Sequence, residues 1–244
     1  MAEPGYRSQR SPPLFFGRVH YSACFALSCH EENVQVIPGV VLAGGASSRM
    51  GGRPKALLPT GYGSETFLSR IVSALRVGGV DDVLVVAGYH VEKIRLEADL
   101  VTPPIRVLHN QDPGRGQLSS LLVALSAIDH PGVRAMLVTP VDLPLVSPKT
   151  VRAVIEGYRR TGSSIVRPTC DGRHGHPVLF DRLLFDELRC ADPDFGAKSV
   201  VRAHAGDGME IAVEDEGAFT DVDTPEDYEQ VFGVSLPAAL SREM

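Results

Sequence analysis

The residues best suited to chemistry in this sequence lie together between Gly44 and Lys55. This stretch follows the short β-branched run Val40–Leu42 and combines glycines and serines with two arginines and a lysine. Glycines allow backbone N–H groups to face a ligand that a Cβ atom would hold away. Guanidinium and ammonium groups supply the countercharge for phosphate. The segment is therefore predicted to be a phosphate-binding loop at the carboxyl end of a buried strand.

The loop matches neither of two common phosphate-binding motifs. In place of G-x-x-x-x-G-K-[ST], Gly51-Gly52 is followed by Arg53-Pro54-Lys55. The pattern G-x-G-x-x-G is also missing, and no acidic residue ends a strand about 20 positions later to hold a ribose. Because both motifs are missing, the sequence does not favour an ATPase or a dinucleotide-binding protein. A glycine-rich surface turn is the alternative, but basic residues directly after a buried strand favour a phosphate loop.

Acidic residues follow two later apolar segments. Asp142 emerges after the expected strand Met136–Thr139, at an edge where an α/β enzyme would hold Mg²⁺ beside a triphosphate. Asp221 and Asp223 are two apart on an expected strand over Phe219–Val222, so they are predicted to share one face. One of them could complete the metal site with Asp142. The alternative is that Asp142 only caps a turn or the following helix.

The histidines and cysteines carry a weaker signal. His174 and His176 lie in a turn, and His174 is expected to be exposed while His176 orders the turn or contacts a ligand. The four cysteines form no C-x-x-C pair, so a structural zinc site is not expected. No histidine or cysteine is a convincing nucleophile.

Alternating strand and helix patterns must position these groups. Apolar runs predict strands, separated by helices with 3.6-residue spacing; the strands fall at 40–42, 83–87, 105–108, 136–139, 165–167, 177–180, 211–213 and 219–222. This order predicts an α/β, Rossmann-like, mainly parallel sheet with helices on both faces. The short late strands predict a small antiparallel flap in the second half. Residues 37–233 are expected to form the domain, with a disordered extension over 1–36 and a tail over 234–244.

Composition limits the possible partners. The chain has 244 residues, 43% of them hydrophobic, and a net charge of −6. A local basic loop in an acidic protein favours a small anionic ligand over nucleic acid. No apolar run reaches the roughly 18 residues needed to span a bilayer. A cytoplasmic protein with free thiols and no membrane partner is expected.

Several motifs, in this order, resemble those of the MobA/MocA-type nucleotidyltransferases. These GT-A-like enzymes transfer a nucleotidyl group to molybdopterin and related phosphorylated acceptors. The resemblance runs from Pro38 to Phe232. The matching motifs are Leu42-Ala43-Gly44-Gly45-x-Ser47-Ser48-Arg49-Met50-Gly51 with Lys55, Gly116-x-x-Ser119-Ser120-Leu121, Asp142-Leu143-Pro144, Gly175-His176-Pro177 and Asp221-Val222-Asp223-Thr224-Pro225-Glu226-Asp227.

The resemblance assigns roles to individual residues. Arg49 would bind the β- and γ-phosphates, Lys55 the α-phosphate, and Asp142 and Asp223 the Mg²⁺ ion. His176 and Lys198 would contact the acceptor, although a solvated helix position is the alternative for Lys198. Arg49, Lys55 and Asp142 are the expected catalytic residues. The expected nucleotide-binding residues are Leu42, Ala43, Gly44, Gly45, Ser47, Ser48, Arg49, Lys55, Ser119 and Ser120.

The implied reaction is attack of an acceptor phosphate on the α-phosphorus of an NTP, with release of pyrophosphate. Gly44-Gly45 resembles the GTP-using members, whereas Ser119-Ser120-Leu121, Leu57-Leu58-Pro59 and Gly175-His176-Pro177 resemble the CTP-using ones. We expect CTP and a molybdopterin acceptor, with a molybdoenzyme or its chaperone as a possible partner. The alternatives are a GTP-using or sugar-phosphate enzyme, a non-catalytic binding protein and an oxidoreductase.

Overall fold

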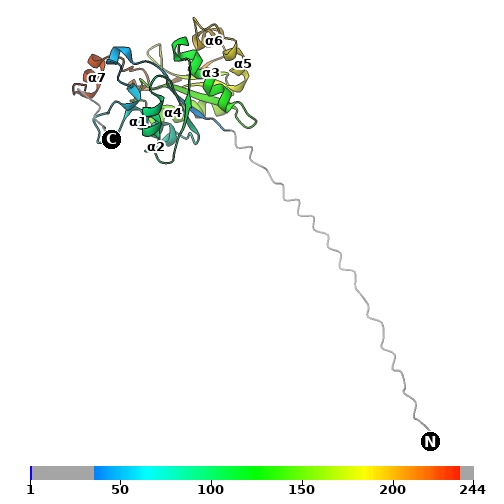
Figure 1. Ribbon diagram of the computed structural model, residues 1–244. Helices are drawn as coiled ribbons and strands as arrows, with labels where there is room; N and C mark the ends of the chain where they lie inside the picture. The colour runs from blue at the N-terminus through cyan, green and yellow to red at the C-terminus, as the bar shows by residue number, and fades with distance from the viewer. Residues whose placement is uncertain (2–35, 237–244) are drawn as a thin grey trace. The chain divides into compact units, whose positions relative to one another are not determined.

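The strand that leads into the glycine loop, β1 (Gly39–Ala43), belongs to an eight-stranded mixed sheet in the computed structural model (Figure 1). It pairs in parallel with β2 (Val83–Ala87) and β4 (Ala135–Pro140), and β2 pairs in parallel with β3 (Arg106–His109). Every residue of β1, β2 and β4 is buried. Such unbroken apolar runs are typical of parallel strands covered on both faces, and the expected parallel sheet is confirmed.

The antiparallel strands of the second half extend the same sheet. β7 (Val178–Asp181) lies antiparallel to both β4 and β5 (Ile165–Cys170). β6 (Arg173–His174) forms a short hairpin with β5, and β8 (Met209–Ala212) pairs with β5 in parallel. The strand order is β3-β2-β1-β4-β7-β5-β6, with β8 also beside β5.

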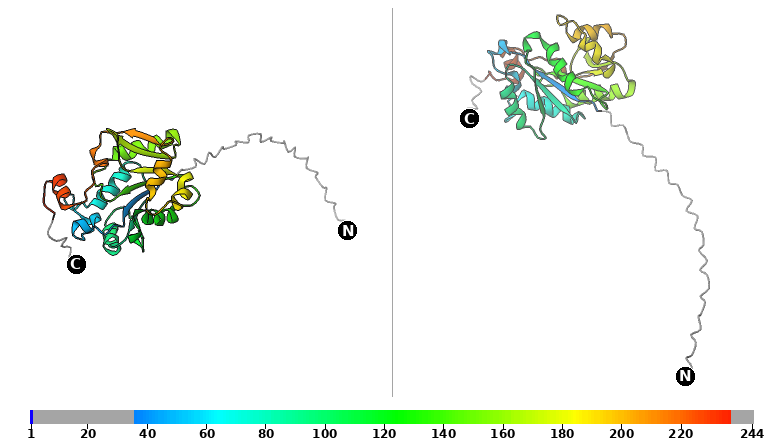
Figure 2. Two further views of the ribbon diagram at one scale, coloured as in Figure 1. Left: turned by 90° about the horizontal axis from the view of Figure 1, so that it is seen from above. Right: turned by 45° about the vertical axis from the view of Figure 1, so that its right-hand side comes forward.

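Helices cover both faces of the sheet because side chains alternate along each central strand. In β1, Val41 and Ala43 join one apolar cluster, and Val40 and Leu42 join the other. Figure 2 gives further views of these layers. The first cluster includes side chains of α1 (Phe67–Val77), α2 (Val91–Asp99) and α4 (Pro148–Thr161); the second includes those of α3 (Gln117–Ile128), α5 (Phe185–Arg189) and α6 (Ala197–Ala203).

Helix starts agree with the capping chemistry of the sequence. Ser147 accepts a hydrogen bond from the Thr150 N–H at the start of α4, with Pro148 in the first turn. Thr224 and Asp227 form a reciprocal capping box at the start of α7 (Pro225–Phe232). The Asp227 carboxylate also accepts from the Asp223 N–H. The cap of α7 thereby fixes the backbone that carries Asp223.

The predicted strand Phe219–Val222 is wrong. A 3₁₀ turn, η5 (Glu216–Ala218), is followed by irregular chain. Val222 donates its backbone N–H to the Asp142 carbonyl at 2.8 Å, but Asp142 lies in a loop, and a single bond makes no strand ladder. The burial of Val222 comes from a small apolar cluster instead, which contains Met50, Leu58, Phe67, Val222 and Tyr228.

The structure describes Met1 and residues 36–236. The predicted extension over 1–36 lies, apart from its two ends, outside the described residues, as do residues 237–244 of the predicted tail. Within the described part, no helix combines the length and apolar character that crossing a bilayer requires.

The cap of α7 generates a stability prediction. Replacing Thr224 by Ala removes the oxygen that accepts the Asp227 N–H, so the free energy of unfolding should fall by about 1 kcal/mol. Urea denaturation measures this change. Ser126→Ala is the control, because Ser126 is exposed in the last turn of α3, caps no helix start and bonds back to the Leu122 carbonyl. Equal stability of the Thr224 variant and wild type would contradict the capping role.

Candidate active site

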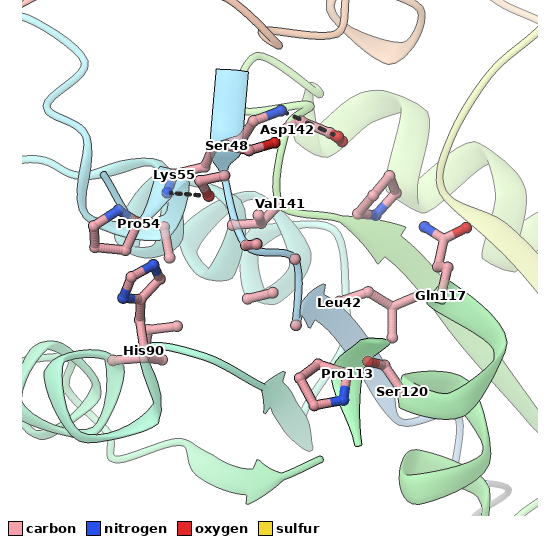
Figure 3. A pocket seen from close by; sticks show the side chains of 18 of the residues that line it. Leu42, Ser48, Pro54, Lys55, His90, Pro113, Gln117, Ser120, Val141 and Asp142 are labelled. Carbon is pink, nitrogen blue, oxygen red and sulfur yellow. Dashed lines mark hydrogen bonds and ion pairs between the residues drawn. The ribbon is translucent and has the colours of Figure 1, made fainter. Parts of the chain in front are cut away.

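A cavity of about 330 Å³ lies where the parallel strands end. Its walls are the glycine loop after β1, His90 after β2, the start of α3, and Val141 and Asp142 after β4 (Figure 3). Ligands of open α/β sheets bind at this carboxyl edge. The sheet topology therefore brings together groups that are far apart in the sequence.

The residues predicted to bind nucleotide and metal gather at this cavity with one exception among the nucleotide-binding set. Arg49, Lys55, Asp142 and Asp223 all line it. Ser119 does not, because its hydroxyl group bonds to the Gly116 carbonyl oxygen at 2.7 Å and thus serves the start of α3. The remaining predicted nucleotide-binding residues in the wall are Leu42, Ala43, Gly44, Gly45, Ser47, Ser48 and Ser120.

The glycine loop is anchored at both ends of its basic segment. Ser47 has a left-handed backbone (φ 52°), and its hydroxyl oxygen accepts the Lys55 N–H at 3.3 Å. Met50 is fully buried in the same apolar cluster as Val222 and Tyr228. Arg49 precedes Met50 and stays two-thirds exposed. The loop is thus fixed by an apolar anchor, while the Arg49 side chain lies at the wall of the cavity.

Two glycines permit the close packing of loops beside the cavity. A Cβ atom on Gly44 would lie 2.5 Å from the Ser120 hydroxyl oxygen. A Cβ atom on Gly88 would lie 2.4 Å from the Gly44 carbonyl oxygen. Buried Asn110 donates to the Ser120 hydroxyl at 3.0 Å and so holds it against the loop. The Gly44 position is therefore filled by a hydroxyl group from α3.

Lys55 lies between the two carboxylates that were predicted to hold metal. Its ammonium group forms a short ion pair with the Asp223 carboxylate and is 3.7 Å from that of Asp142. Arg49 reaches the other Asp223 oxygen at 2.8 Å. The Lys55 side chain is only 12% exposed, so water screens these interactions weakly.

The carboxylates differ in their electrostatic surroundings. Burial raises the pKa of Asp142. The positive charge of Lys55 lowers it by a smaller amount, and the negative charges of Asp221 and Asp223 offset part of that lowering. Burial also acts to raise the pKa of Asp223, but hydrogen bonds and charge from Lys55 and Arg49 lower it overall. The surroundings therefore favour the charged form of Asp223 and disfavour that of Asp142.

Asp221 is a charged neighbour of Asp142 but not a part of the cavity wall. It is exposed and does not line the cavity, although burial of its carboxyl group and the nearby Asp223 raise its pKa. The expectation that Asp221 and Asp223 share one face rested on the strand that does not form. Among residues 36–236, no group of three or more His, Cys, Asp or Glu side chains is placed to hold a metal by itself.

A second cavity of about 690 Å³ adjoins the first and contains both predicted acceptor residues, His176 and Lys198. Lys198 and Arg202, one turn apart on α6, add exposed positive charges to its wall. His174 is exposed, as expected, and lies 2.7 Å from a Glu210 carboxylate oxygen. Apolar side chains line much of the remainder, including Leu118, Leu121, Val138, Val178, Phe180 and Val201.

His176 cannot supply positive charge near neutral pH. Burial, together with the nearby Lys198 charge, lowers its pKa to about 4 despite a smaller raising effect of the Val138 backbone. Its Nδ1 atom is buried without a hydrogen-bond partner within the described part of the chain. Any contact between His176 and a ligand would therefore involve the neutral ring.

Sequence reasoning missed His90, Gln117 and Arg202. His90 directly precedes α2 and Gln117 begins α3, so both follow strand ends at the edge where the glycine loop lies. The rule that every parallel strand end contributes to the site could have found them. Arg202 gave no such signal, because it belongs to none of the motifs and does not follow a strand end.

Comparisons with known proteins agree with this architecture. Residues 39–208 match the sequence profile of the MobA-like NTP transferase domain. A nicotine blue oxidoreductase of Paenarthrobacter nicotinovorans is 30% identical over 80% of this chain and 96% of its own length. A probable molybdenum cofactor guanylyltransferase of Rhodopirellula baltica is 34% identical over 52% of this chain and 58% of its own.

Solved structures agree as well. Rv0371c of Mycobacterium tuberculosis aligns with a TM-score of 0.71 and 31% identity, covering 82% of this chain and 99% of that one. A crystal structure of Rv0371C in complex with manganese aligns with a TM-score of 0.65 and 28% identity, covering 81% and 98%.

The contact between Gly44 and Ser120 can be tested by a double-mutant cycle. Gly44→Ala should lower the free energy of unfolding by about 1–3 kcal/mol, because the new methyl group overlaps the Ser120 hydroxyl. Adding Ser120→Ala should recover part of this loss, since the next neighbours of the methyl group, the Ser120 Cβ at 3.7 Å and the Gly88 N at 4.0 Å, lie at ordinary contact distance. Gly45→Ala is the control, with no atom within 4 Å of its added Cβ. Additive losses in the double variant would refute the contact.

His176 generates a pH prediction. Its pKa of about 4 lies below the ordinary value of 6.5, so the unfolded chain binds more protons between these values. The free energy of unfolding should therefore fall as pH drops from 6.5 to 4, by up to about 3 kcal/mol from this residue. His176→Gln should lose that part of the slope in urea denaturation at each pH. Identical slopes would show that the imidazole is not held neutral.

Proposed function

Since the chain belongs to the MobA-like NTP transferase family, we propose that it transfers a nucleotidyl group from an NTP to a phosphorylated acceptor. An acceptor phosphate oxygen would form a bond to the α-phosphorus. The bond between the α-phosphorus and the bridging oxygen to the β-phosphate would break, and pyrophosphate would leave. The observation that carries this proposal is the contact between the cationic glycine loop and Asp142 and Asp223 in the wall of one cavity.

The residues of the site fit the chemistry of the proposed transfer. A phosphate nucleophile is already anionic near neutral pH, so no general base is needed. Lys55 and Arg49 would bind the triphosphate and neutralise charge that develops on the leaving pyrophosphate. The backbone of the glycine loop would position the nucleotide so that its α-phosphorus faces the second cavity.

The donor set also fits a divalent cation, for which we propose Mg²⁺. Mg²⁺ prefers oxygen ligands and is commonly held by one or two carboxylates together with substrate phosphates. Asp142 and Asp223 would be those carboxylates, because both reach the same Lys55 ammonium group. When bound, the cation would supply positive charge to the triphosphate. The manganese complex of Rv0371C supports the use of a divalent cation.

The nucleotide would be CTP or GTP. Relatives named as probable molybdenum cofactor guanylyltransferases support GTP. The CTP preference rests on sequence features such as the Ser119-Ser120 pair, and only Ser120 of these lines the cavity. Molybdopterin is the proposed acceptor, and Lys198 and Arg202 offer cationic contacts in the second cavity. A molybdoenzyme or its chaperone would then receive the product.

An oxidoreductase is the second candidate, favoured by the nicotine blue oxidoreductase that matches over nearly its whole length. This second candidate function predicts that the protein oxidises NADH or NADPH with a dye acceptor such as nicotine blue. The absence of G-x-G-x-x-G from the sequence weighs against this activity.

A pyrophosphate-release assay separates the candidates. Purified protein is incubated with Mg²⁺, molybdopterin and each of the four NTPs in turn, and a parallel assay follows NADH and NADPH absorbance with nicotine blue. We expect pyrophosphate only when both an NTP and the acceptor are present. Cofactor oxidation without pyrophosphate release would replace the transferase proposal by the oxidoreductase one.

Asp142 provides the sharpest variant test of the proposal. Asp142→Asn keeps the shape of the side chain but removes the negative charge, and transfer should fall by about 100-fold or more. Asp221→Asn is the matched control and should stay close to wild type, because Asp221 does not line the cavity. Pyrophosphate release measures both rates. If the Asp142 variant kept wild-type activity, Asp142 would have no role in the reaction.

A further inference from the structure

We infer that the side-chain amide of Gln117 contacts the substrates where the two cavities meet and orients the acceptor phosphate toward the nucleotide. This inference rests on the proposed transfer reaction. It adds a substrate-contacting residue that neither the sequence motifs nor the comparisons indicate.

The first observation is the shared wall of the two cavities. Leu42, Gly116 and Gln117 line both the cavity of the glycine loop and the cavity of Lys198. Leu42 has an apolar side chain and Gly116 has none. Gln117 is therefore the one residue of this shared wall whose side chain can form hydrogen bonds.

The second observation is that the Gln117 amide is available. The residue is exposed at the first position of α3, and no hydrogen bond to its side chain is found within residues 36–236. In Figure 3 its side chain extends from α3 beyond Ser120, with the amide at its end. In contrast to the Gln117 amide, the neighbouring hydroxyl groups of Ser119 and Ser120 already have a partner, because both accept a hydrogen bond from the Asn110 side chain.

The chemistry of the reaction explains why an amide would be placed there. Nucleotide and acceptor occupy different cavities, but the product joins them through a diphosphate. The two phosphates of the product must therefore lie beside the wall residues that the two cavities share. A glutamine N–H can donate to a non-bridging phosphate oxygen without taking up or releasing a proton. It can thus orient the attacking phosphate while Arg49 and Lys55 hold the triphosphate.

Nucleotide conjugates test this inference without requiring turnover. CDP-choline and GDP-mannose carry a substituted diphosphate like that of the product, whereas CTP and GTP carry the free triphosphate. Isothermal titration measures the affinity of all four for wild type and for Gln117→Met, which keeps the length of the side chain but removes its donor. Gln230→Met is the matched control, because Gln230 is exposed on α7 and lines neither cavity.

We expect Gln117→Met to weaken at least one conjugate by about tenfold, a loss typical of a hydrogen bond to a charged group, and to change NTP affinity less than about twofold. The control variant should match wild type. Equal losses for conjugates and NTPs, or no loss for any, would overturn the inference. Selective loss in a protein that releases no pyrophosphate would support the junction contact and reject the transfer reaction. If wild type bound no nucleotide, both proposals would fail.

Discussion

The ammonium group of Lys55 connects three segments that are far apart in the sequence. It belongs to the glycine loop after β1, and it contacts Asp142 after β4 and Asp223 just before α7. These partly buried ion pairs are weak evidence for stability, because the desolvation of the charges can exceed their attraction. The arrangement is better explained by a site in which these charges change partners when substrate binds. Under the proposed function, phosphates would bind the Lys55 and Arg49 side chains, and a divalent cation would bind the two carboxylates.

Packing behind the charges keeps these segments together. Met50 follows Arg49, and Val222 precedes Asp223; both are fully buried in one cluster with Tyr228 of α7. The Tyr228 hydroxyl donates to the Pro59 carbonyl at 2.8 Å, which ties α7 to the chain that follows the glycine loop. The match to the family ends at residue 208. The C-terminal segment beyond that point nevertheless supplies one of the two carboxylates and the packing that holds it.

Local patterns in the sequence predicted most of the fold. The strands around Val40–Leu42 and Val83–Ala87 depend on neighbouring residues, and both are present. The strand predicted at Phe219–Val222 fails because Val222 packs beside Tyr228 of α7, while Phe219 packs against a different apolar cluster. Contacts such as Gly44 with Ser120, and the wall shared by two cavities, depend on tertiary structure that no local pattern encodes.

The central claim is that the cationic loop and the two carboxylates form one site for a triphosphate and a divalent cation. Isothermal titration of the wild-type protein with CTP and with GTP, in excess Mg²⁺ and again in excess EDTA, tests it most directly. Because ligands that share one site are thermodynamically coupled, Mg²⁺ should raise the affinity for at least one NTP by about tenfold or more. Equal affinity in Mg²⁺ and EDTA, or no binding of either nucleotide, would contradict it.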